Sequence, residues 1–139
     1  MSDSDRCPSC DRALTHVSVP PELREFAPER AAVVGSCPRC LRTVALPDED
    51  PGDGDGVLRS GSEPPAAVPG SEGGAALLLA FGYLDSVALN RSEIEALLGH
   101  AERAGADAFL TLDRLAADGS IDAHADLARR RRQLETMLD

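Results

Sequence analysis

Lysine and tryptophan are absent from the sequence, and aromatic residues are scarce. All 14 basic residues are arginines, and aromatic residues make up 3% of the 139 positions. No run reaches the roughly 18 apolar residues that a membrane span requires. The most apolar segment, residues 75–84, contains Gly82 and is followed by Asp85. Because the first five residues are polar and acidic, unlike a signal peptide, the sequence predicts a cytoplasmic protein with no membrane span.

Motifs that would mark a catalytic site are also missing. The sequence has no G-x-S-x-G nucleophile elbow, no glycine-rich phosphate-binding loop and no H-E-x-x-H helix. Asp53-Gly54-Asp55-Gly56 resembles the start of a calcium loop, but Pro64 stands where an EF-hand needs its closing Glu. We therefore expect a protein that is not an enzyme.

Negative charge is in large excess over positive charge. The formal net charge is −10 at pH 7. An acidic, alanine-rich and lysine-free composition is typical of proteins from salt-loving archaea, in which surface carboxylates keep the chain hydrated. The same acidity removes the positive surface that most nucleic-acid-binding proteins carry.

All four cysteines lie in two C-P-x-C tetrapeptides, Cys7 to Cys10 and Cys37 to Cys40. A C-x-x-C turn places two sulfurs on one side of a tight loop, where they can share a metal ion. Two such turns supply the four thiolates of a tetrahedral structural zinc site. The spacer of 26 residues is longer than the usual ~15–20 but fits a small ribbon. The sequence therefore predicts a structural Zn²⁺ bound by Cys7, Cys10, Cys37 and Cys40.

Two other readings of the cysteines stay open. A rubredoxin-like iron site also uses paired turns, although such sites usually have Gly after the second Cys, where this chain has Asp11 and Leu41. A thiol-redox pair is the second alternative, but a redox C-x-x-C normally opens the helix of a βαβ unit, and the sequence shows no such unit.

The chain divides by composition into three parts. Residues 1–46 are predicted to form a small β zinc ribbon. Its strands are expected near 13–19, 31–36 and 41–46, and one helical turn is expected at 21–26. Residues 47–74 carry seven acidic residues, one Arg and many Gly and Pro, so they read as an acidic flexible linker. Residues 75–139 read as an all-α helical bundle, and the predicted fold class is α+β.

Four short helices are expected in the C-terminal part. The first, at 75–89, is apolar on nearly every side. We expect three short amphipathic partners to leave part of it uncovered, which favours a homodimer. Asn90 with Glu93 is the expected start of the second helix, and Gly105 is its expected end. Asp107 and Asp122 are the expected caps of the third and fourth helices.

Arginines near the second cysteine pair and in the last helix are the candidates for nucleic-acid contact. They are Arg39 and Arg42, together with Arg129, Arg130, Arg131 and Arg132. Consecutive residues cover all faces of a helix, and pairs such as Arg131 with Glu135 neutralise part of the run. Nucleic-acid binding is therefore the second hypothesis.

Three segments together resemble an uncharacterised family of small zinc-ribbon proteins from haloarchaea. They are the two cysteine pairs, the stretch VPPELREFAP at 19–28 and the stretch LDSVALNR at 84–91. The resemblance implies a cytoplasmic zinc-binding protein and carries over no catalytic residue. We interpret the chain as a non-enzymatic adaptor or regulator whose helices dock a protein partner or a second copy.

Overall fold

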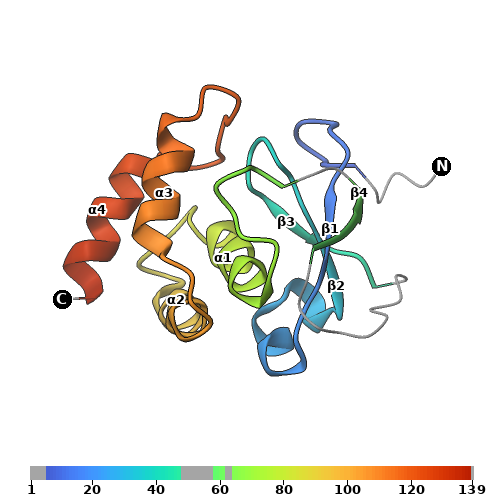
Figure 1. Cartoon of the computed structure of the whole chain (residues 1–139), viewed down its shortest axis with the longest axis horizontal. Helices are drawn as coiled ribbons and strands as arrows, with labels where there is room; N and C mark the ends of the chain where they lie inside the picture. The colour runs from blue at the N-terminus through green and yellow to red at the C-terminus, as the bar shows by residue number, and fades with distance from the viewer. Residues whose placement is uncertain (1–5, 48–57, 62–63, 139) are drawn as a thin grey trace.

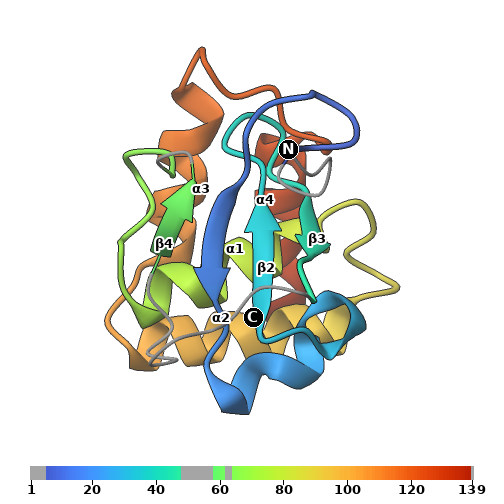
Figure 2. The same ribbon diagram turned by 90° about the vertical axis from the view of Figure 1, so that its right-hand side faces the viewer.

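The N-terminal half of the chain builds an antiparallel sheet. The computed structural model describes residues 6–47, 58–61 and 64–138. The sheet has the order β3-β2-β1-β4, and Figure 2 shows it face on with α1 behind it. All neighbouring strands pair antiparallel, with Val17 opposite Val34 and Gly35 opposite Val44. The strands are β1 (Thr15–Ser18), β2 (Val33–Ser36), β3 (Thr43–Ala45) and β4 (Leu58–Gly61).

The fourth strand lies where the sequence predicts a linker. β4 pairs with β1, so Leu58 is opposite Val17 and Gly61 is opposite Thr15. Val68, also within 47–74, is 5% exposed and belongs to the main core. Two parts of the predicted linker therefore join the folded structure: β4 pairs with the edge of β1, and Val68 packs in the core. The most acidic part of the predicted linker, residues 48–57, lies outside the described residues.

The C-terminal part is helical, as the sequence predicts. The helices are α1 (Glu72–Gly82), α2 (Arg91–Arg103), α3 (Ala108–Ala117) and α4 (Leu127–Leu138). Asp107 caps α3 by accepting a hydrogen bond from the Leu110 N–H at 2.9 Å, which confirms that prediction. The predicted cap of α4 at Asp122 is wrong: Asp126 accepts from the Arg129 N–H at 3.1 Å, and the helix starts four residues later than a cap at Asp122 would give.

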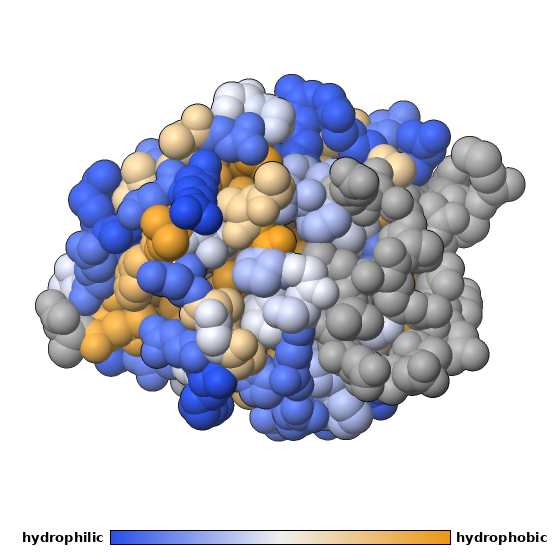
Figure 3. Space-filling model, viewed as in Figure 1, coloured by the Kyte–Doolittle hydropathy of each residue, from blue (hydrophilic) through white to orange (hydrophobic). Residues whose placement is uncertain are grey.

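Helix α1 is the central element of the molecule. Figure 1 shows it between the sheet on one side and α2, α3 and α4 on the other. Residues 73–81 are all buried, so the chain itself covers the helix on every side. The exposed apolar cylinder that motivated a homodimer is therefore not present. Figure 3 shows mostly hydrophilic residues on this side of the molecule, with smaller hydrophobic areas between them.

Sheet and helices share one hydrophobic core. Val17, Val34 and Leu41 belong to the same buried cluster as the helical residues Leu77 and Leu97. α1 passes so close to β3 that a Cβ on Gly82 would lie 2.6 Å from Thr43 Oγ1, which explains why this position has no side chain. The division at residues 46 and 75 stays a prediction about independent folding. No helix in the described part of the chain is long and apolar enough to cross a membrane.

Candidate metal centre

The two cysteine turns have the same backbone structure. In the first, the Cys7 N–H donates to the Arg12 carbonyl at 2.8 Å and the Asp11 N–H to the Cys7 carbonyl at 2.9 Å. In the second, the Cys37 N–H donates to the Arg42 carbonyl at 2.9 Å and the Leu41 N–H to the Cys37 carbonyl at 3.0 Å. The first turn precedes β1 and the second joins β2 to β3, so the sheet brings them together.

The residue after each turn has a left-handed backbone. Asp11 has φ 57° and Leu41 has φ 66°, in a region that costs a residue with a Cβ about 1–2 kcal/mol. Asp tolerates this conformation well, but Leu rarely adopts it. Leu41 is 0% exposed and is part of the main core, so its packing offsets the strain. The side chain therefore fastens the second turn to the rest of the protein.

The four sulfurs form one compact group. Every pair of Sγ atoms lies within 4.8 Å, and Cys7 Sγ is 3.6 Å from Cys40 Sγ. A tetrahedral metal with bonds of about 2.3 Å to sulfur needs S···S edges of about 3.8 Å. Cys7, Cys37 and Cys40 are buried, Cys10 is partly exposed, and none is in a disulfide. The residues present therefore fit a single thiolate-bound metal ion.

Hydrogen bonds and burial set the acidity of the thiols. Burial raises the pKa of Cys10 to about 12 and also raises the pKa of Cys37. Burial is also the largest single effect on Cys40, and it acts to raise the pKa. Hydrogen bonds from the backbone and side chain of Arg42 and from Cys37 and Cys10 outweigh it together and lower the pKa of Cys40 to about 7. The Cys40 N–H also donates to Cys37 Sγ at 3.4 Å. Such donors stabilise thiolates and would support a bound metal ion.

Residues 6–138 match the model of a family of unknown function, DUF6276. The chain belongs to the DUF6276 family. Neither the curated proteins nor the solved structures contain a match. The match covers both cysteine turns and all four helices of this DUF6276 protein, so one family model includes the cysteine group and the helical part.

Arginines beside the second turn have different surroundings. Arg42 directs its guanidinium at Cys40, and the resulting hydrogen bond is the main cause of its own raised pKa. Arg39 lies on the surface with its Nη2 atom 4.0 Å from Asp122 Oδ2. Of the two predicted nucleic-acid contacts in this part of the DUF6276 chain, Arg42 faces the sulfur cluster and Arg39 remains accessible.

The four consecutive arginines of α4 are divided between partly exposed contacts with neighbouring elements and a surface groove. Arg131 pairs with Asp113 at 2.5 Å and with Glu135, and its guanidinium lies over the Phe109 ring at 5.1 Å. Arg130 donates to the Asp85 carbonyl at 3.0 Å. Arg129 and Arg132 line the groove instead. The structure therefore does not bring the six predicted arginines together.

A loop far along the chain docks on the second cysteine turn, which the sequence does not reveal. The Asp122 N–H donates to the Arg39 carbonyl at 2.8 Å, and the His124 N–H donates to the Cys40 carbonyl at 2.9 Å. The His124 ring bonds the Phe81 carbonyl near the end of α1 through Nε2 at 2.9 Å, and because a carbonyl only accepts, Nε2 carries the proton. The connection between α3 and α4 thus links the second cysteine turn to the central helix.

A second group of possible ligands joins three elements. Glu22, Glu72 and His100 place one ligand atom each within 4.8 Å of the others. His100 Nε2 lies 3.4 Å from Glu72 Oε1, and Glu22 is exposed. The contact of His100 with Glu72 therefore joins α2 to α1 in the DUF6276 protein.

Proposed function

We propose that this protein is a non-enzymatic adaptor or regulatory protein with a structural zinc ion. The observation that carries the proposal is the convergence of four cysteine sulfurs from two identical turns. Four thiolates fill a tetrahedral shell and leave no open position for a substrate, which favours a structural over a catalytic metal. In this proposal the sheet and its two turns form a zinc ribbon, and the helices provide the interaction surface.

Zinc is favoured over iron and over thiol redox chemistry by the composition of the site. Sulfur distances alone suit either metal, but the first alternative lacks the usual Gly after each turn, since Asp11 and Leu41 occupy those positions. In the redox alternative one C-x-x-C would open a helix, whereas both turns here lie at the ends of strands. A cytoplasmic location, where thiols stay reduced, suits a metal site of free cysteines.

Elemental analysis and absorption spectroscopy test the metal directly. Protein purified without added metal should contain one zinc per chain and be colourless, whereas an iron–thiolate protein would be red. Affinity capture from native cells in molar salt, with the zinc-loaded full chain as bait, tests the adaptor role. Recovery of nucleic acid alone would favour the second hypothesis, a nucleic-acid-binding regulator that uses Arg39. Recovery of neither a protein nor a nucleic acid would contradict the adaptor.

A homodimer stays a prediction, but the exposed apolar surface of α1 that suggested it is not present. Since α1 is covered by its own chain, self-association would have to use another face. Light scattering of the full chain at tens of micromolar in molar salt decides whether a second copy is a partner.

A further inference from the structure

A groove on the helical side of the protein has a charge opposite to that of the molecule. It runs between residues 87–91 and α4 and encloses about 960 Å³. Three of its eight lining residues are arginines, and none of the lining residues in the described part of the chain is acidic. The whole chain carries 24 acidic residues and a net charge of −10. A carboxylate-free, arginine-lined groove is therefore an exception on this surface. It is lined by Val87, Ala88, Arg91, Arg129, Arg132, Gln133, Thr136 and Met137.

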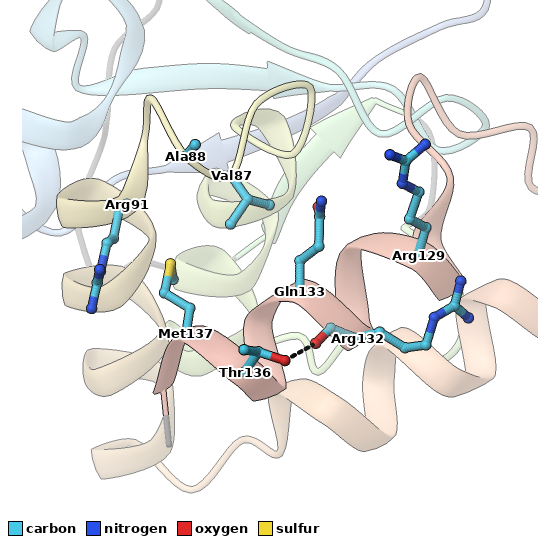
Figure 4. A pocket seen from close by; sticks show the side chains of 8 residues that line it. All are labelled: Val87, Ala88, Arg91, Arg129, Arg132, Gln133, Thr136 and Met137. Carbon is cyan, nitrogen blue, oxygen red and sulfur yellow. Dashed lines mark hydrogen bonds between the residues drawn. The ribbon is translucent and has the colours of Figure 1, made fainter.

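The α4 side of the groove is a single helical face. Arg129, Arg132, Gln133, Thr136 and Met137 have the i, i+3, i+4, i+7 and i+8 spacing that places side chains in one stripe. Figure 4 shows the two arginines of this stripe at one end of the groove and Met137 towards the other. The stripe thus changes from basic to apolar along the helix.

The opposite side of the groove is fixed by contacts with the same helix. Arg130 Nη2 donates to the Asp85 carbonyl at 3.0 Å, which holds the segment before α2 against α4. Val87 is 5% exposed and Met137 packs on the main core, so the two form an apolar floor. The groove is therefore built into the fold.

Arg129 and Arg132 are available for an external partner. Both are exposed, and neither is in an ion pair with any residue that the structure describes. Arg91, at the other side, pairs with Glu95 at 2.9 Å and remains 60% exposed. By contrast, the neighbouring Arg131 is used internally. Two unpaired guanidiniums beside an apolar floor suit carboxylates that flank apolar side chains.

We propose that this groove binds a short acidic peptide segment of a partner protein, with apolar side chains on Val87 and Met137 and carboxylates on Arg129 and Arg132. The inference rests on the proposed adaptor function and names its partner class. A peptide is favoured over nucleic acid because no aromatic side chain lines the groove for base stacking. In addition, a chain of net charge −10 repels a long polyanion more than a segment with a few carboxylates.

Fluorescence anisotropy with the zinc-loaded full chain tests the groove. The probe is a fluorescein-labelled peptide of about twelve residues with leucines on one helical face and glutamates elsewhere. Two comparison probes are the same peptide with lysines in place of glutamates and a labelled single-stranded oligothymidine. We expect the glutamate probe to bind and the other two to bind at least about tenfold more weakly.

Matched variants assign the binding to the groove. Arg129→Gln combined with Arg132→Gln should weaken binding of the glutamate probe about tenfold or more, because both charges that face the carboxylates are lost. Arg103→Gln combined with Arg114→Gln removes the same charge from exposed positions outside the groove and should leave binding within about twofold. Ala88→Trp, at an exposed lining residue, should block binding without changing charge.

Several results would overturn the inference. Equal binding of the glutamate and lysine probes, equal loss in both double variants, or no effect of Ala88→Trp would each remove the groove as a carboxylate-peptide site. Tighter binding of oligothymidine, lost in the Arg129 and Arg132 variant, would assign the groove to nucleic acid instead. Zinc is measured on the same samples. A fully zinc-loaded chain that binds no probe contradicts only the groove, whereas a chain that takes up no zinc contradicts the proposed function.

Discussion

Removal of the metal should loosen the connection between α3 and α4 as well as the cysteine turns. The perturbation is Cys37→Ser, which deletes one thiolate and leaves three. Structural zinc contributes about 10–16 kcal/mol of apparent binding free energy in small zinc domains at neutral pH. That exceeds the stability of many whole domains, which is about 5–15 kcal/mol. We therefore expect the variant to lose zinc and both cysteine turns to become disordered.

The effect beyond the turns can be estimated from two hydrogen bonds. The N–H groups of Asp122 and His124 donate to the carbonyls of Arg39 and Cys40 at 2.8 and 2.9 Å. Each such bond contributes about 0.5–1.5 kcal/mol net, so the loop should lose about 1–3 kcal/mol of local stability when the turn disorders. This corresponds to amide hydrogen exchange that is faster by about fivefold to about 150-fold.

Hydrogen exchange measured by mass spectrometry on the full chain is the assay. Peptides covering 119–125 are compared between wild type, Cys37→Ser and Ser9→Ala, which changes an exposed residue of the first turn that is not a ligand. Peptides from α2, which is remote from the sulfurs, serve as the internal reference. Protection of 119–125 that is unchanged after zinc loss would refute the coupling. Equal acceleration in α2 would indicate global unfolding and would also contradict it.

Three further predictions concern stability, pH and proteolysis. Leu41→Ala should lower the free energy of unfolding by about 2–5 kcal/mol in urea titration, because the side chain is fully buried where the second cysteine turn meets the core. A change below about 1 kcal/mol would contradict the role of Leu41 in attaching the turn to the core. Metal affinity should fall on acidification, because protons compete with the metal for the thiols, and burial raises the pKa of Cys10 to about 12. A zinc titration that gives equal affinity at about pH 8 and pH 6 would be inconsistent with thiolate ligands. Limited proteolysis should cut first within 48–57, since the glycine- and aspartate-rich sequence there has few apolar residues to pack; a first cut within α1 would contradict it.

Sequence patterns predicted the local features of the fold well. The paired C-P-x-C motif identified the four residues whose sulfurs converge. Pro21 with Glu22 indicated the single helical turn that the structure has at Pro21–Phe26. Asp107 was recognised as the cap of α3 because its signal lies within four residues of the chain. Each of these features depends on neighbours in sequence, and such neighbours are visible without a structure.

Features that depend on distant partners were not predictable. β4 is a short strand that ends at Gly61, and it pairs with β1, which is about 40 residues away in the sequence. The docking of Asp122 and His124 on the second turn involves backbone groups, which leave no side-chain signal. The apolar surface of α1 was recognised, but periodicity does not say whether the covering surface comes from the same chain. The sheet covers it, because both units share one core.

The charge distribution has a structural reason in addition to general acidity. A metal ion with four thiolates carries a net charge of −2, which is costly to bury in an already acidic protein. Residues 1–46, which contain the site, carry as many arginines as acidic residues, six of each. Arg42 bonds Cys40 directly, so one of these arginines neutralises the site itself. The remaining negative charge lies in residues 47–139, away from the sulfurs in sequence. Six of the 14 arginines lie in residues 1–46, and of these Arg42 contacts the cysteine group. We therefore expect that replacing Arg42 with Gln reduces zinc affinity more than replacing the exposed Arg12 with Gln.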